Sequence, residues 1–186
     1  MKKLFDLSFG LLLALVLLFP MLFIGLIIRL TSRGSAIYWS RRVGKENIEF
    51  FMPKFRTMLL KTPQVATHLL MDVDKYYSPV GSFLRRSSLD ELPQLLSIIK
   101  GDMSFVGPRP ALFNQHDLKK LRSEDNIDIL RPGVTGWAQV NGRDDLSIEQ
   151  KVKFDKEYLK NASFKFDLYI IWLTLKKVLR SDGISH

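Results

Sequence analysis

Residues 9–28 read FGLLLALVLLFPMLFIGLII and carry no charged side chain. A run of roughly 20 apolar residues is long enough to cross the hydrocarbon core of a bilayer as a helix. A secretory signal peptide has a shorter apolar region that ends in small residues at a cleavage site. This run instead ends in the basic sequence RLTSRGS. We therefore predict that residues 9–28 form a membrane segment.

The predicted membrane segment is basic at both ends and has a proline in its middle. The basic residues around it are Lys2, Lys3, Arg29, Arg33, Arg41 and Arg42. Positive charge favours the cytoplasmic side, so both ends are expected there. Pro20 removes one helix hydrogen bond and bends the axis, and Asp6 and Ser8 are the only nearby polar side chains that could serve freed backbone groups. A kinked spanning helix and a re-entrant helix that turns at Pro20 both fit this pattern.

The composition of the chain points to an anionic partner. The 186 residues include 28 Lys plus Arg and 19 Asp plus Glu, which gives a formal net charge of +9. Such an excess suits nucleic acid, anionic lipid headgroups or phosphate-bearing substrates. The absence of cysteine excludes disulfides, thiolate-rich zinc sites and cysteine nucleophiles.

The remainder of the sequence predicts one mostly helical α+β domain without internal repeats. Aromatic and β-branched residues on either side of the turn GKEN predict a short β-hairpin within residues 36–58. Residues 60–80 have no clear period, and residues 101–146 are rich in loops around one polar helix. The predicted helices cover 89–100, which ends at Gly101, as well as 115–123, 147–161 and 164–180.

Residues 87–94, SSLDELPQ, place two adjacent acids at the start of a predicted helix. Pro93 is tolerated only in the first turn, so this helix should begin between Leu89 and Leu92. One interpretation is an ordinary capping box from Ser88 to Glu91. In the other interpretation, Asp90 meets a phosphorylated substrate, and a metal ion or arginines offset the repulsion between the anions. Adjacent helical residues point about 100° apart, so the two acids would have separate roles.

Several arginines lie in rigid loops or close to these acids, where they could bind phosphate. Their planar guanidinium groups suit two-pronged hydrogen bonding to phosphate oxygens. The candidates are Arg56 in KFRTM, Arg85 and Arg86 before the acids, Arg109 in GPRP, Arg131 in RPG and Arg143 in NGR. The sequence has no P-loop and no GxGxxG motif, so phosphate would be bound by side chains.

Taken together, KFRTM, SLDELPQLLSIIKGDMSFVGPRP, RPGVTGWAQVNGR and the proline-broken N-terminal helix resemble the bacterial sugar transferase family. Within that family the chain resembles the minimal catalytic form of the monotopic phosphoglycosyl transferases. The resemblance runs from Lys2 to about Ser181. The second of these motifs matches without a gap, which makes a chance match a poor explanation.

The resemblance implies transfer of a sugar 1-phosphate from a UDP-sugar to polyprenol (undecaprenyl) phosphate, with polyprenol diphosphate sugar and UMP as products. It implies that Asp90 is the nucleophile, forms a covalent phosphosugar intermediate and binds Mg²⁺. Glu91 would support metal binding or handle a proton of the acceptor. The implied phosphate-binding residues are Arg56, Arg86, Arg109 and Arg143. Asp167 matches a family acid with a structural part.

The resemblance also favours the re-entrant interpretation of the N-terminal segment. It implies a membrane helix-break-helix over 1–32, broken at Phe19-Pro20, and a catalytic domain over 33–186 with amphipathic interfacial helices. Phe19 stands where the family has a serine. The implied location is the bacterial inner (cytoplasmic) membrane, with membrane lipids around the helix and the site on the cytoplasmic face. Homo-oligomers are compatible with this picture.

Three other functions fit parts of the sequence. In a membrane-bound phosphodiesterase or pyrophosphatase, water would intercept the Asp90 intermediate. A basic membrane scaffold would bind acidic partners without catalysis. A nucleic-acid module fits the charge but not the apolar N-terminus, so no nucleic acid is expected as a partner. The sugar itself is not readable, and we expect its recognition to involve residues 60–80 and 111–130.

Overall fold

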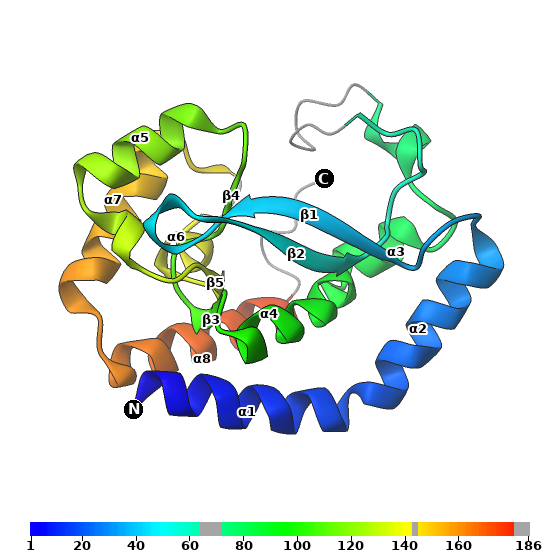
Figure 1. Cartoon of the computed structure of the whole chain (residues 1–186), viewed down its shortest axis with the longest axis horizontal. Coiled ribbons are helices and arrows are strands. Elements are labelled where there is room, and N and C mark those ends of the chain that lie inside the picture. Colours follow the sequence, from blue (N-terminus) through cyan, green and yellow to red (C-terminus); the bar gives the residue numbers. More distant parts are fainter. Residues whose placement is uncertain (64–71, 143–144, 181–186) are drawn as a thin grey trace.

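The computed structural model describes residues 1–63, 72–142 and 145–180, and it shows a mostly helical α+β fold with a small sheet (Figure 1). The α-helices are α1 (Lys2–Val16), α2 (Leu18–Thr31), α3 (Gly81–Arg86), α4 (Leu95–Lys100), α5 (His116–Glu124), α6 (Trp137–Val140), α7 (Ile148–Asn161) and α8 (Phe164–Arg180). The strands are β1 (Ile37–Val43), β2 (Glu49–Phe55), β3 (Ser104–Val106), β4 (Ala111–Leu112) and β5 (Gly133–Thr135). The 3-10 helices are η1 (Lys45–Asn47), η3 (Val73–Tyr76), η4 (Leu89–Gln94) and η5 (Ile127–Ile129).

The predicted hairpin is confirmed. Strands β1 and β2 pair antiparallel, from Ile37 opposite Phe55 to Val43 opposite Glu49, and η1 forms the turn between them. Strand β4 adds to the other edge of β1, which gives the sheet order β2-β1-β4. Of the segment predicted to be irregular, residues 64–71 lie outside the described part of the chain.

A second, parallel pair of strands joins two segments that the sequence analysis treated as loops. β3 pairs with β5 in the register Ser104 to Gly133 and Val106 to Thr135. The glycine that follows β3 lies directly against the segment that contains β5: a Cβ on Gly107 would lie 2.2 Å from the carbonyl oxygen of Arg131. Only a residue without a side chain permits this approach. The contact fixes the loop that carries Arg109.

The apolar N-terminal run forms two helices that meet at an angle of 60°. The break lies at Leu17, three residues before the predicted position, and Pro20 sits in the first turn of α2. Pro20 has no N–H to donate to the carbonyl of Val16, so the hydrogen-bond ladder is interrupted upstream of the proline. Among the described residues no single helix has the length and composition to cross a bilayer, whereas α1 and α2 together do.

Helix α1 lies along α4 and β3 (Figure 1). Phe5 and Phe9 pack against Phe105 with ring centroids 6.2 and 5.2 Å apart, and Leu13 and Leu17 pack on the core beside α4. The two polar side chains near the break, Asp6 and Ser8, do not hydrogen bond to the backbone groups freed there. Asp6 accepts a hydrogen bond from the Phe105 N–H (3.3 Å), and Ser8 donates to a carbonyl within α1.

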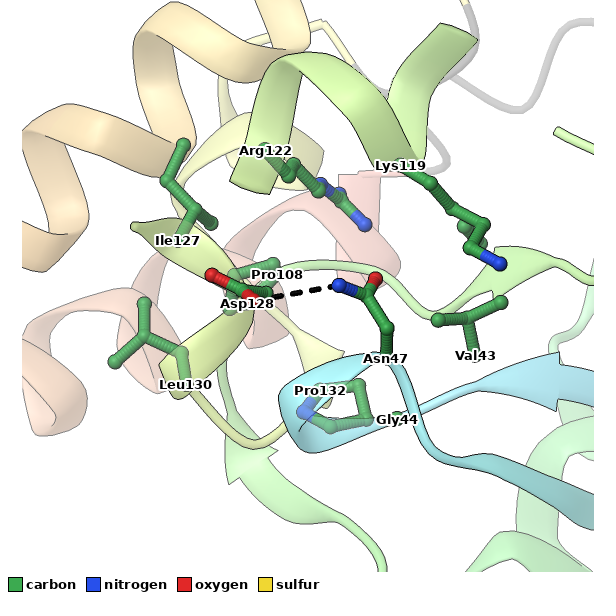
Figure 2. A pocket seen from close by; sticks show the side chains of 11 residues that line it. Val43, Gly44, Asn47, Pro108, Lys119, Arg122, Ile127, Asp128, Leu130 and Pro132 are labelled. Atoms are coloured by element: carbon green, nitrogen blue, oxygen red, sulfur yellow. Dashed lines mark hydrogen bonds between the residues drawn. The ribbon is translucent and has the colours of Figure 1, made fainter. Parts of the chain in front are cut away.

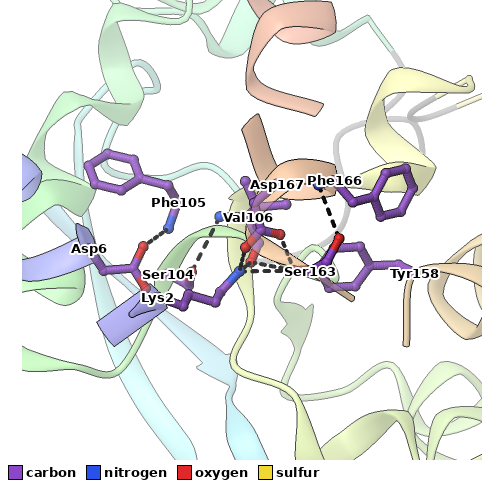
Figure 3. A network of polar contacts seen from close by, with 9 residues as sticks. All are labelled: Lys2, Asp6, Ser104, Phe105, Val106, Tyr158, Ser163, Phe166 and Asp167. Carbon is purple, nitrogen blue, oxygen red and sulfur yellow. Dashed lines mark hydrogen bonds and ion pairs between the residues drawn. The ribbon is translucent and has the colours of Figure 1, made fainter. Parts of the chain in front are cut away.

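A polar network ties the start of α1 to the C-terminal helices (Figure 3). Lys2 Nζ donates to Asp167 Oδ2 (2.6 Å), to the Tyr158 hydroxyl (2.9 Å) and to the Val106 carbonyl (2.9 Å). Tyr158 in turn donates to Asp167 Oδ1 (2.6 Å), and burial together with this carboxylate raises the pKa of the phenol. Asp167, which the resemblance implied to be structural, thus binds the beginning of the chain to α8.

The close approach of Gly107 to the backbone of Arg131 allows the packing of β3 against the β5 segment to be tested. We expect Gly107→Ala to lower the melting temperature of the purified protein in detergent, at a cost of roughly 1–3 kcal/mol or more, because its Cβ would overlap backbone atoms. The matched variant Gly25→Ala adds the same methyl where the nearest atom lies 3.8 Å away. It should leave the melting temperature unchanged or raise it. Equal effects of both variants would contradict the assigned packing.

Candidate active site

The two adjacent acids lie on η4, directly before α4. The predicted helix does begin at Leu89, but as a 3-10 helix, and it ends at Gly101 in the left-handed conformation (φ 89°). The predicted capping box is wrong: Ser88 has φ 56° and its side chain makes no capping hydrogen bond. Asp90, two residues after Ser88, is buried in the protein and is only 5% exposed.

Glu91 is held by two cations from distant segments. Its Oε1 accepts hydrogen bonds from Lys54 Nζ (2.7 Å) at the end of β2 and from Arg109 Nη2 (3.3 Å) after β3. Glu91 and Lys54 side chains are 13% and 14% exposed, so the pair is largely withdrawn from water. Burial lowers the pKa of Lys54, whereas the nearby carboxylates of Glu91 and Asp90 act to raise it. Glu91 therefore organises the cations of the site.

Asp90 is the reactive candidate of the two acids. Within the described ranges its carboxylate makes no hydrogen bond and no ion pair. Burial raises the pKa of Asp90 to about 6, and the neighbouring Glu91 adds to this, whereas Lys54, Arg85 and Arg109 act in the opposite direction. A buried carboxylate that is ionised at neutral pH and lacks fixed partners is available to bind a cation or to attack an electrophile.

Four basic side chains in the described part of the chain act on one or both acids. Lys54, Arg85 and Arg109 act on Asp90, and Arg42 interacts with Glu91. Burial, and then repulsion from Arg109, lowers the pKa of Arg42 to about 10. Such a group of cations suits a diphosphate or phosphate ligand.

The structure separates the predicted phosphate-binding arginines. Arg109 lies at the acids, as described above. Arg56 is buried elsewhere, where its guanidinium donates to the carbonyls of Ser32 (3.1 Å) and Arg33 (2.7 Å) at the end of α2. Arg86 is exposed on α3. Arg143 lies outside the described residues.

Arg42 and Lys54 were not predicted to lie at the site. Of the two arginines before the acids, Arg86 and not Arg85 was given a phosphate-binding role. Arg42 and Lys54 lie on neighbouring strands, and strand alternation places Arg42 on the same sheet face as Ser40, to which its Nε donates (2.9 Å). Strand alternation in the sequence could therefore have predicted the sheet face on which Arg42 lies. No sequence signal separates Arg85 from Arg86, because their orientations follow from how α3 packs.

The loop that carries Arg109 is braced from behind. Arg122 donates to the Arg109 carbonyl (2.9 Å) and, through Nε and Nη2, to Asp155 Oδ2 (3.0 and 2.7 Å). Arg122 also lines a small pocket, shown in Figure 2 with the hydrogen bond from Asn47 to Asp128 (3.3 Å). That pocket has a volume of about 30 Å³, enough for a water molecule but not for a substrate.

A larger cavity opens beside η4. It has a volume of about 350 Å³, and its lining includes the charged residues Glu91 and Arg109 but not Asp90. Leu13 and Leu17, at the break between α1 and α2, line its apolar side with Leu92 and Leu95. This size is within the usual range of small-molecule sites, roughly 300–1,000 Å³. The cavity therefore joins a cationic site to the apolar N-terminal helices.

The residues at the site suit Mg²⁺ only together with a phosphate ligand. Among the described residues there is no cluster of three or more His, Cys, Asp or Glu side chains that could hold a metal. Mg²⁺ is commonly bound by one or two carboxylates that share it with substrate phosphates and water. Asp90, with Glu91 beside it, fits that pattern.

Comparison with known proteins shows the family of this chain. The family model for bacterial sugar transferases matches residues 1–181. The uncharacterized sugar transferase EpsL of Bacillus subtilis is 39% identical over 186 residues, which cover 100% of this chain and 91% of EpsL.

Two longer relatives have more informative names. The undecaprenyl-phosphate galactose phosphotransferase of Salmonella typhimurium is 39% identical over 81% of this chain and 34% of its own length. The UDP-glucose:undecaprenyl-phosphate glucose-1-phosphate transferase of Escherichia coli is 38% identical over 89% of this chain and 37% of its own length. The chain thus spans about a third of these two proteins. The family match covers nearly the whole sequence, and the chain belongs to the bacterial sugar transferase family.

Proposed function

We propose that this protein transfers a sugar 1-phosphate from a UDP-sugar to a membrane polyprenol phosphate, most simply undecaprenyl phosphate, and is thus a transferase of the EC 2.7.8 type. The products are UMP and a polyprenol diphosphate sugar, which begins assembly of a polysaccharide, lipopolysaccharide or glycoprotein glycan. The names of the Salmonella and Escherichia coli relatives support the substrate classes. The observation that carries the proposal is the buried Asp90 carboxylate, which makes no hydrogen bond or ion pair among the described residues and has the cations Lys54, Arg85 and Arg109 acting on it.

In the proposed first step an Asp90 carboxylate oxygen attacks the β-phosphorus of the UDP-sugar. The bond from that phosphorus to the bridging oxygen breaks, UMP leaves with the electron pair, and an aspartyl phosphosugar remains. In the second step an oxygen of the polyprenol phosphate attacks the same phosphorus and releases the Asp90 carboxylate. An acyl phosphate is reactive enough to be resolved by a second nucleophile.

The surrounding residues have separate parts in this scheme. Arg109 and Lys54 stabilise negative charge on the transferring phosphoryl group, and Glu91 holds both of them in place. Arg42 and Arg85 add positive charge near Asp90. Mg²⁺, when bound, would neutralise phosphate charge and so lessen its repulsion from Asp90.

We further propose that α1 and α2 enter the cytoplasmic face of the bacterial inner membrane and leave by the same face. The 60° bend, the basic residues at both ends and the exposed apolar side chains support this placement. Leu15, Phe19 and Phe23 are 71%, 79% and 64% exposed, which is costly in water and favourable in lipid. The apolar side of the cavity would then receive the first isoprene units of the acceptor.

Replacement of Asp90 separates activity from stability. We expect Asp90→Asn to lower UMP release by roughly 10³-fold or more, because the nucleophile is lost. The raised pKa means that ionised Asp90 destabilises the fold at neutral pH. The variant should therefore be as stable as the wild type or more so, by up to about 3 kcal/mol. Retained UMP release in a folded Asp90→Asn protein would contradict the proposal, and a scaffold would release no UMP even as the wild type.

The pKa of Asp90 also sets a pH dependence. Attack requires the ionised carboxylate, so the rate should fall below about pH 6 rather than near pH 4. Lys54 lowers the pKa of Asp90, and Lys54→Met should therefore move this acid limb to higher pH, which rate profiles of UMP release would measure. Lys45→Met makes the same change on an exposed turn residue and should leave the limb in place. An unmoved limb in Lys54→Met would show that another group controls it.

A hydrolase is the competing enzyme. In that case water would resolve the Asp90 intermediate, and free sugar 1-phosphate would accumulate from the UDP-sugar without any acceptor. We expect instead that steady turnover requires added undecaprenyl phosphate and that the sugar phosphate is recovered in the lipid fraction. Steady release of free sugar 1-phosphate in the absence of acceptor would favour the hydrolase.

A further inference from the structure

Four polar residues that border the larger cavity have no part in the proposed chemistry. They are Thr135, Gln139, Thr174 and Lys177, and together we call them its polar side. Thr135 ends β5, Gln139 lies on α6, and the other two lie on α8. The polar side is therefore formed by elements that are distinct from those that carry the nucleophile.

Gln139 is the unusual member of this set. Its Oε1 and Nε2 are both buried, and neither has a hydrogen-bond partner in the described part of the chain. A buried amide without partners typically costs free energy and calls for an explanation. The Oε1 lies toward Gly136, where an added Cβ would be 2.7 Å from it. Rotation of the amide toward the cavity would therefore sacrifice no hydrogen bond.

The hydroxyl of Thr135 can only accept from a ligand. Thr174 Oγ1 donates its proton to the Ile170 carbonyl (2.8 Å), so the 2.7 Å contact between the two threonine hydroxyls must be a donation from Thr135. Thr135 Oγ1 keeps a free lone pair and has no proton left to give. Together, Thr135 and Gln139 offer two acceptor oxygens and one NH₂ group with two N–H donors.

We propose that Thr135 and Gln139 bind hydroxyl groups of the sugar that is transferred. This inference rests on the proposed function and names the part of the site that holds the sugar. The sugar is attached to the phosphorus that Asp90 attacks, so it must lie in space continuous with Glu91 and Arg109, as this polar side does. It also places sugar contacts outside the segments 60–80 and 111–130, where the sequence analysis expected them.

The hydrogen-bonding inventory favours a hydroxylated part of the donor, and the comparison with UDP below separates the transferred sugar from the ribose. A hexosyl group presents several hydroxyls, each able to donate to the acceptors of Thr135 and Gln139 and to accept from the Gln139 amide. The uracil imide presents a single N–H donor. A phosphate dianion presents acceptors alone and cannot satisfy the two acceptors on the protein. The apolar side of the cavity suits the prenyl chain instead.

Binding measurements with and without the sugar test this proposal. UDP-glucose, UDP-galactose and their 2-acetamido derivatives would first be screened for UMP release, and the best donor would serve as the probe. The dissociation constants of that donor and of UDP would then be measured by calorimetry in Asp90→Asn protein, with and without Gln139→Leu. We expect Gln139→Leu to weaken donor binding on the order of tenfold, the size of a lost hydrogen bond, and to leave UDP binding within about twofold. Thr135→Val should act in the same direction with a smaller effect.

A matched glutamine distinguishes recognition from folding. Gln150 closes a capping box with Ser147 at the start of α7, away from the cavity. Gln150→Leu should lower the melting temperature and leave donor binding unchanged. Gln139→Leu should leave the melting temperature unchanged or raise it, because an unpartnered buried amide is removed.

Three results would overturn the inference. Equal weakening of UDP and donor binding by Gln139→Leu would assign the amide to the nucleotide. Unchanged donor binding in a folded Gln139→Leu protein would show that the amide meets no ligand, while UMP release by the wild type would still support the proposed function. Absence of UMP release by the wild type with every donor would contradict the proposed function and this inference together.

Discussion

The site depends on how the protein accommodates two adjacent carboxylates away from water. Burying an uncompensated charge is costly, so the acids of η4 require cations. Lys54 comes from the hairpin, Arg109 from the loop after β3, and both meet on a single oxygen of Glu91. One acid thus draws three segments together, and Asp90 beside it keeps a carboxylate that makes no hydrogen bond among the described residues. The division of roles follows from this asymmetry: Glu91 organises, and Asp90 remains available for chemistry.

The N-terminal helices are joined to the same framework at its backbone. Asp6 binds the Phe105 N–H and Lys2 binds the Val106 carbonyl, so α1 is fixed to the strand that leads into Arg109. The close approach at Gly107 holds the next residue of that segment, and Arg122 holds the Arg109 carbonyl. The positions of the apolar helices and of Arg109 at the acids are therefore coupled through one short strand. A site built this way can present a fixed charge pattern at the edge of an apolar region.

Patterns of residues in the sequence predicted the elements with strong local signals. The GKEN turn and Gly101 marked a hairpin and a helix end correctly, and the family motifs brought Asp90, Glu91 and Arg109 together. The parallel strands β3 and β5 were missed because three residues are too few to show a period. Arg56 was predicted to bind phosphate, yet its guanidinium donates to the carbonyls of Ser32 and Arg33, just after α2. These features depend on contacts between segments that are distant in sequence. The burial of the Gln139 amide without a partner likewise depends on how distant segments pack.

In the proposed reaction, Asp90 forms a covalent bond to the phosphorus of the donor. Rapid quenching of the wild-type protein with a UDP-sugar that it uses, without polyprenol phosphate, followed by digestion and mass spectrometry, tests it directly. The account predicts that the peptide containing Asp90 gains the mass of a sugar phosphate, that the modification maps to Asp90 and not to Glu91, and that added undecaprenyl phosphate removes it. Release of UMP with no mass gain on that peptide would contradict the account.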